Sequence, residues 1–265
     1  MIRLRDLLFE FEDLSWFPNI IRESMTDYLR YVITLLNYYE PITPILKEGL
    51  AKTGATQIID LCSGGGGAIE QIKNNLQLTG SYNLQIVLTD KFPNINAYQL
   101  LYEKTNGSIS FETNTVDAAN VPAELQGFRT IFSGFHHFDI SSAKAVLNNA
   151  VNANSGIAIF DGGDKNVFVT ILITLLQPFA FFFLTPFFKP FKFSRLIFTY
   201  LVPLIPICTM WDGVVSMIRL YRPVELLAIA RQVEDEKYYW KTGKVKNKLG
   251  MSVAYLIGYP FTKDQ

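Results

Sequence analysis

The sequence predicts an α/β fold with a doubly wound, mostly parallel sheet. Three observations predict it: apolar runs of strand length alternate with helical patterns, a glycine-rich turn follows the first run, and two further strand-like runs close the chain. The 265 residues suffice for one large domain or two small ones. Apolar residues make up 49% and charged residues 18% of the chain, which excludes a disordered chain.

The N-terminal residues have a helical pattern. Tyrosine and leucine recur at helical spacing between Leu7 and Leu50, so residues 1–54 are assigned to a helical cap and residues 55–265 to the main domain. The first residues mix acids with apolar side chains and lack a small-residue cleavage site, so we expect no export and a cytoplasmic location. Cys62 and Cys208 lie far apart in sequence, which fits a reducing compartment.

Seven strands are expected, bounded by glycine, aspartate and asparagine. They are Gln57–Cys62, Leu84–Asp90, Ile109–Val116, Arg129–Phe135, Gly156–Asp161, Tyr238–Lys246 and Ser252–Tyr259. Helices fit between the first five strands, and Pro223–Gln232 is expected to form another, with proline in its first turn. The last two strands are expected to form an antiparallel pair.

The strongest local motif runs from Ile58 to Ile72. An apolar strand ends in Asp60, and four glycines precede a helix. Glycine permits positive φ and close approach of a ligand, and the N–H groups at the helix start face that ligand. The next strand ends in Asp90, where an open α/β sheet places a carboxylate against ribose hydroxyls. Surplus acid would repel a pyrophosphate, whereas S-adenosylmethionine has no phosphate and carries two cationic groups.

These residues resemble the first motif of the class I S-adenosylmethionine-dependent methyltransferases. Asp60, Gly64 and Gly66 match by spacing, and Cys62 stands at the family's first glycine. The stretches FEFEDLSWFP and WDGVVSMIRLY are also similar to a little-characterised bacterial group of methyltransferases. The resemblance implies a Rossmann-like, seven-stranded sheet with an antiparallel closing strand and S-adenosylmethionine as cofactor. The implied cofactor contacts are Asp60, Cys62, Ser63, Gly64, Gly66, Asp90, Lys91, Asp117, Ala118 and Ser133.

The chain has two histidines, the adjacent His136 and His137, at the expected end of the fourth strand. Ligands bind at this edge of an open α/β sheet, so a histidine here could be the general base for a hydroxyl acceptor. Neighbouring side chains on a strand point in opposite directions, so one of the two would face the site. The alternative is that both fill space in the fourth-strand motif. We expect no bound metal.

Polar residues near the expected ligand edge are candidates for substrate binding. Asp161 follows the fifth strand, whereas Asp212 and Arg219 follow an apolar stretch and could orient a polar head group or pair with each other. The acids Glu10, Glu12 and Asp13, with Trp16, either close the cofactor pocket or belong to a solvated cap.

An apolar insertion spans residues 165–211. No charged residue occurs in Val167–Phe188 or in Leu196–Trp211. A helix of 22 residues would be roughly 33 Å long, enough for a hydrocarbon core of about 30 Å. However, Pro178, Pro186, Pro203 and Pro206 interrupt the two runs, and strands of the same sheet precede and follow them.

We therefore expect short helices broken by proline that lie over the cofactor edge and insert only shallowly into a bilayer. An aromatic face containing Phe179 would enter the interface, and Lys189, Lys192 and Arg195 would meet anionic headgroups. Phe179 would also contact the substrate. The alternative is that the same residues form an internal lid or a homodimer interface.

The combined features predict a methyltransferase that acts on a lipophilic small molecule or lipid at the inner membrane surface. The first alternative is a non-catalytic module that binds S-adenosylmethionine or another nucleoside and uses the apolar segment for a membrane or protein partner. The second is a nicotinamide-dependent oxidoreductase. Lysine plus arginine number 24, as do aspartate plus glutamate, so no basic surplus indicates a nucleic-acid partner.

Overall fold

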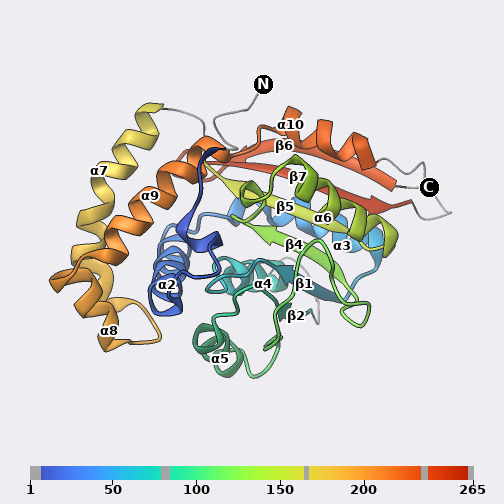
Figure 1. Cartoon of the computed structure of the whole chain (residues 1–265). Helices are drawn as coiled ribbons and strands as arrows, with labels where there is room; N and C mark the ends of the chain where they lie inside the picture. The colour runs from blue at the N-terminus through green and yellow to red at the C-terminus, as the bar shows by residue number, and fades with distance from the viewer. Residues whose placement is uncertain (1–6, 79–83, 164–166, 234–237, 262–265) are drawn as a thin grey trace.

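The computed structural model describes residues 7–78, 84–163, 167–233 and 238–261. These residues form one seven-stranded sheet with helices on both faces (Figure 1). The strands are β1 (Gln57–Leu61), β2 (Gln85–Leu88), β3 (Ile109–Phe111), β4 (Phe128–Phe132), β5 (Ile157–Gly162), β6 (Tyr238–Lys246) and β7 (Ser252–Pro260). Their spatial order is β3-β2-β1-β4-β5-β7-β6.

The strand pairing confirms the predicted Rossmann-like sheet. Strands β1 to β5 pair in parallel, and β7 runs antiparallel to both β5 and β6. From β1 the chain first adds β2 and β3 on one side and then places β4 and β5 on the other. The reversal between β1 and β4 creates the crevice in which open α/β sheets bind ligands.

Strands β3 and β4 each end three or more residues before the expected position. The strand expected to reach Val116 ends at Phe111, and the one expected to reach Phe135 ends at Phe132. Ser133 has a φ of 50°, a left-handed conformation that ends β4, and a short helix η3 (Phe135–His137) follows. The histidines follow β4 as expected, but a helical turn carries them, so the alternation of side chains along a strand does not apply to them.

Helices cover both faces of the sheet. They are α2 (Asn19–Leu35), α3 (Thr43–Thr53), α4 (Ile69–Leu78), α5 (Ile95–Lys104), α6 (Ile140–Asn152), α7 (Val167–Leu184), α8 (Phe193–Leu196), α9 (Leu204–Arg219) and α10 (Pro223–Ala230). One core cluster holds Ile58 with side chains of α3, α4 and α5, and the other holds Ile59 with side chains of α6 and α10. Adjacent residues of β1 thus face opposite layers. Helix α3 lies within residues 1–54, the expected helical cap, but its side chains pack against the sheet in the first core cluster.

The insertion forms a helical unit at one end of the sheet, on the left in Figure 1. Helix α7 packs against α9, and both join α2 in a third core cluster. Within it the Tyr28 ring stacks on the Phe181 ring with 4.1 Å between centroids. Helix α7 continues through Pro178, contrary to the expected break, and the chain turns at Pro186 and Pro203 instead.

The expected aromatic face is only partly exposed. Phe181 and Phe188 are buried against α2, whereas Phe179, Phe182, Phe183 and Phe187 are each at least 60% exposed. In the described part of the chain, no single helix combines the length and apolar character needed to cross a membrane. One bent pair, Phe193–Leu201 with Leu204–Arg219, meets both criteria together at an angle of 78°.

Two basic residues of the insertion, Lys192 and Arg195, point inward. Arg195 is 1% exposed and forms an ion pair with Asp27 of α2, which has no exposed surface. Lys192 Nζ lies 2.7 Å from Glu23 Oε2 and 3.2 Å from Asp27 Oδ2. The expectation that Lys192 and Arg195 meet lipid headgroups was wrong. Both cations instead pair with the buried carboxylate of Asp27 on α2, and a buried charge is costly without such partners. Lys189 is exposed.

The Asp27 ion pair should contribute strongly to stability. Asp27→Asn leaves the buried Arg195 guanidinium without its carboxylate, and breaking a buried pair in this way costs about 3–5 kcal/mol. We expect the free energy of unfolding, measured by urea denaturation, to fall by that amount.

A matched control is Glu70→Gln, which removes an exposed pair with Lys104 at 2.7 Å. Such a change costs about 0–1 kcal/mol. Equal losses in the two variants would show that the insertion does not depend on Asp27.

Candidate functional site

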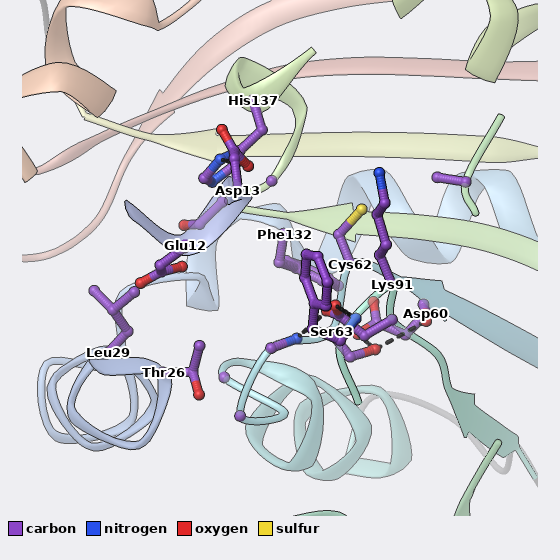
Figure 2. Close-up of a pocket in the computed structure, with 18 of the residues that line it drawn as sticks. Glu12, Asp13, Thr26, Leu29, Asp60, Cys62, Ser63, Lys91, Phe132 and His137 are labelled. Atoms are coloured by element: carbon purple, nitrogen blue, oxygen red, sulfur yellow. Dashed lines mark hydrogen bonds and ion pairs between the residues drawn. The ribbon is translucent and has the colours of Figure 1, made fainter. Parts of the chain in front are cut away.

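A cavity of about 490 Å³ lies at the carboxyl ends of β1, β2 and β4. The glycine turn after β1 and the loop after β2 form one wall. Helix α2, Glu12 and Asp13 of the N-terminal segment and the turn after β4 that carries His137 form the other. Figure 2 shows the two walls facing each other, with Asp60, Ser63 and Lys91 on one side and Asp13 and His137 on the other. The cavity therefore occupies the crevice created by the reversed strand order.

Close packing explains the run of glycines. Gly64 and Gly66 have φ values of 53° and 80°, which glycine adopts at no steric cost. A Cβ on Gly66 would lie 2.3 Å from Leu101 Cδ1, and one on Gly65 would lie 2.7 Å from the Thr26 carbonyl oxygen of α2. Two helices thus press on the turn from different sides. Gly66 supports it from behind and does not line the cavity.

Asp60 is held by two hydroxyl groups. Its Oδ2 accepts a hydrogen bond from Ser63 Oγ at 2.7 Å and its Oδ1 accepts one from Thr130 Oγ1 at 2.6 Å. Desolvation by burial raises the pKa of Asp60 to about 7, although the two hydrogen bonds oppose this effect. A cation bound nearby would favour the charged form of this carboxyl group.

Asp90 connects the end of β2 to the glycine turn. Its Oδ2 accepts a hydrogen bond from the Gly64 N–H, and its Oδ1 accepts one from the Phe92 N–H, both at 2.8 Å. Burial raises the pKa of Asp90. Each oxygen keeps a second lone pair that can accept from a ligand hydroxyl.

The structure brings most of the implied cofactor residues together. Cavity-lining residues are Asp60, Cys62, Ser63, Gly64, Asp90, Lys91, Asp117, Ala118 and Ser133, and His137 lines it as well. The other candidates, Gly66, His136, Asp161, Asp212, Arg219 and Phe179, do not line it.

The insertion does not cover the cavity as expected. None of its described residues lines the cavity, and Phe179 is 63% exposed on α7. Helix α2 occupies that position and lines the cavity with Thr26, Leu29, Arg30 and Ile33, while its other face packs on the insertion. The sequence analysis did not identify these four residues. Leu29, Arg30 and Ile33 follow Thr26 by three, four and seven residues, a spacing that places all four on one face of a helix.

Asp212 and Arg219 hold the N-terminal segment in place. The Asp212 carboxylate accepts hydrogen bonds from the N–H groups of Phe11 at 2.7 Å and Glu12 at 3.1 Å. Arg219 Nη1 lies 3.1 Å from both Glu10 Oε1 and Asp13 Oδ2. The structure therefore gives both residues a structural role in place of the expected contact with a substrate head group.

The two histidines have different surroundings. His136 is 5% exposed, and its Nδ1 lies 3.3 Å from Asp161 Oδ1. His137 faces the cavity, with Nδ1 2.9 Å from Asp13 Oδ1. Desolvation lowers the pKa of His137, but the carboxylates of Glu10, Asp13 and Glu12 outweigh it and raise the pKa to about 10. A histidine that is already protonated at neutral pH cannot accept a proton, so this form of His137 is not a general base.

Acids outnumber bases along the cavity. Five acids, Glu12, Asp13, Asp60, Asp90 and Asp117, line it against four cations, Arg22, Arg30, Lys91 and the protonated His137. Burial raises the pKa of Glu12 to about 8 and that of Asp60 to about 7, so a bound cation would favour the charged form of both groups. Arg22 is committed to protein contacts, since its Nε donates to the Glu12 carbonyl oxygen at 3.1 Å. The cavity therefore suits a ligand that carries positive charge.

Comparisons with known proteins support the fold. No family model matches the chain, and no curated protein matches it. A solved structure from Rhodobacter sphaeroides, described as a zinc-dependent alcohol dehydrogenase, has a TM-score of 0.51 at 10% identity, covering 91% of this chain and 98% of that one.

Two methyltransferase structures are also similar. One, an S-adenosylmethionine-dependent methyltransferase from Aquifex aeolicus, has a TM-score of 0.49 at 14% identity, covering 89% of this chain and 97% of that one. The other, the O-methyltransferase NcsB1 of neocarzinostatin biosynthesis in complex with S-adenosylmethionine and a naphthoic acid, has a TM-score of 0.46 at 11% identity, covering 81% of this chain and 56% of that one. Of these similarities, the one to the Rhodobacter sphaeroides structure, at 10% identity, shows a shared fold.

Proposed function

We propose that this chain is an S-adenosylmethionine-dependent methyltransferase that acts on a lipophilic small molecule or lipid at the cytoplasmic membrane surface. The observation that carries the proposal is the acidic cavity at the switch point, in which the glycine turn lies between Asp60 and Asp90. A cofactor with a sulfonium and an ammonium group and no phosphate matches this charge.

Three carboxylates would hold the cofactor. Asp90 would accept hydrogen bonds from the ribose hydroxyls, Asp60 would face the ammonium group, and Asp117 with Ala118 would contact the adenine. All three acids line one side of the cavity, at the ends of β1 and β2 and in the loop after β3. The Gly64 N–H bond keeps Asp90 against the turn, so its position is fixed before a ligand binds.

The opposite wall would bind the methyl acceptor. Methyl transfer requires alignment of the acceptor with the sulfonium methyl group and exclusion of water. This wall combines the polar Asp13 and His137 with the apolar Leu29, Ile33 and Phe138. Such a mixture suits an acceptor with one polar reactive group on an apolar body.

The exposed aromatic face of the insertion supports contact with a membrane. Phe179, Phe182, Phe183 and Phe187 lie on the outer side of the helical unit, whose inner side packs on α2. Helix α2 also lines the cavity. Helix α2 would therefore connect an insertion bound to a bilayer with the wall of the cavity.

Cofactor binding is tested with S-adenosylhomocysteine and NAD. We expect calorimetry to detect binding of the former and none of the latter. Asp90→Asn replaces an accepting oxygen with a donor, and the loss of hydrogen bonds to a charged group, about 1.5–3 kcal/mol, corresponds to roughly 10- to 150-fold weaker binding. Glu124→Gln, at an exposed position outside the cavity, is the control. Unchanged affinity in Asp90→Asn would contradict the assigned cofactor site.

Catalysis is tested by incubating the protein with methyl-labelled S-adenosylmethionine and a total lipid extract. We expect label in the organic phase, and at least tenfold less with Asp90→Asn at subsaturating cofactor. Binding of S-adenosylhomocysteine without transfer to any lipid fraction would instead favour a non-catalytic module.

Membrane contact is tested by vesicle flotation. Because Lys192 and Arg195 are paired with α2, we expect the protein to float equally with phosphatidylcholine vesicles and with vesicles that also contain phosphatidylglycerol. The double variant Phe182→Ser and Phe183→Ser should lose most of this binding.

Leu78→Ser is a matched control, since Leu78 is 86% exposed at the end of α4, outside the insertion. Protein that stays in the soluble fraction and elutes as a dimer by size-exclusion chromatography would show that the aromatic face is an interface between two copies of the chain.

A further inference from the structure

We propose that Glu10, His136 and His137 form a binding site for one divalent first-row transition metal ion at the acceptor wall of the cavity. This site is independent of the cofactor residues on the opposite wall. Its role in methyl transfer, where it would bind an oxygen of the acceptor, rests on the proposed function.

The donor atoms are already close together. Glu10 Oε2 lies 3.9 Å from His136 Nε2 and 3.6 Å from His137 Nδ1, and the three donor atoms all lie within 4.8 Å of one another. Metal–ligand bonds to nitrogen and carboxylate oxygen are about 2.0–2.2 Å long, so two ligands of one ion are separated by at most about 4.4 Å. Both distances to Glu10 meet this limit. Asp13 Oδ1 lies 2.9 Å from His137 Nδ1 and adds a negative charge beside these three donors.

The tautomer of the neutral His136 ring decides which of its nitrogens can bind a metal ion. A carboxylate only accepts hydrogen bonds, so the contact with Asp161 Oδ1 places a hydrogen on His136 Nδ1. In the neutral ring, Nε2 then carries a lone pair directed toward Glu10 Oε2, and their separation of 3.9 Å is too long for a hydrogen bond. A cation between these two atoms would satisfy both.

The surrounding residues match the second layer of a metal site. Histidine ligands commonly donate their other N–H to a carboxylate, which is the arrangement of His136 and Asp161. Asp161 is 1% exposed, and its other oxygen, Oδ2, has no hydrogen-bond partner among the residues that the structure describes. Ser216 Oγ donates to Glu10 Oε2 at 2.8 Å and helps to fix that carboxylate.

The charge of the cluster also favours a dication. Arg219 contacts Glu10 through Oε1 and Asp13 through Oδ2, so the opposite oxygens of both carboxylates remain on the histidine side. A metal ion that binds His137 displaces the proton from its ring. Glu10, Asp13 and Asp161 then carry three negative charges against one positive charge on Arg219. Two imidazole nitrogens with carboxylate oxygens suit zinc, iron or manganese.

The site would open toward the cavity. Glu10 and His136 are buried at 1% and 5% exposure, whereas Asp13 and His137 line the cavity. A coordination position on the cavity side would therefore be accessible to a ligand oxygen. The acceptor class that follows is an alcohol, phenol or carboxylate.

The test is equilibrium dialysis of metal-free full-length protein against Zn²⁺ and Mn²⁺, with bound metal measured by mass spectrometry. We expect about one ion of at least one metal per chain, and at least tenfold weaker binding in Glu10→Gln and in His136→Gln. Asp139→Asn is the matched control: it removes an acid two residues after His137 but keeps a good helix N-cap, so it should bind metal normally.

S-adenosylhomocysteine binding, measured in parallel, reports whether each variant is folded. As a second measurement that needs no variant, Co²⁺ added to the wild-type protein should give visible absorption bands of nitrogen and oxygen ligation. Absence of a stoichiometric ion in wild-type protein, or equal affinity in Glu10→Gln, would overturn the site. Metal binding without cofactor binding would support the metal site and contradict the proposed methyltransferase. Cofactor binding without metal binding would support the methyltransferase and contradict the metal site.

Discussion

The position of the acceptor wall depends on the guanidinium group of Arg219. It contacts Glu10 and Asp13 of the N-terminal segment and donates to the carbonyl oxygen of His137 in η3. Three parts of the chain that are distant in sequence therefore meet at one planar cation, which sits at the end of α9. Arginine suits this position because its fixed donor geometry binds several oxygens at once.

Helix α2 has two functions in the fold. Through Thr26, Leu29, Arg30 and Ile33 it lines the cavity, and through Tyr28 and its neighbours it packs on the insertion. Asp27 strengthens this second contact, since both Lys192 and Arg195 bind it. Displacement of the insertion would therefore act on the cavity through α2, and also through α9, whose Asp212 and Arg219 hold Glu12 and Asp13.

The sheet and the cofactor wall could be predicted from local sequence. Strand β6 has the predicted bounds Tyr238–Lys246, and Asp60 and Asp90 lie together because parallel strands end at one edge of a sheet. The turn that carries the histidines could not be predicted, because Ser133 adopts a left-handed conformation without a glycine to signal it. The contacts of Glu10 with His136 and Arg219 also escaped prediction, since they join residues far apart in sequence and no local pattern indicates them.

The insertion reverses the usual arrangement of a soluble protein surface. Its charges Lys192 and Arg195 are used inside, and its large aromatic side chains, such as Phe182 and Phe183, remain outside. Full burial of one such side chain contributes about 1.5–3 kcal/mol, so a few of them suffice for reversible attachment to an apolar partner. Attraction to anionic headgroups would add about 1 kcal/mol for each free cation near the surface, but Lys192 and Arg195 are not free. Attachment through this face must therefore depend on apolar area, and it should respond little to ionic strength, because salt screens charges and not hydrophobic contacts.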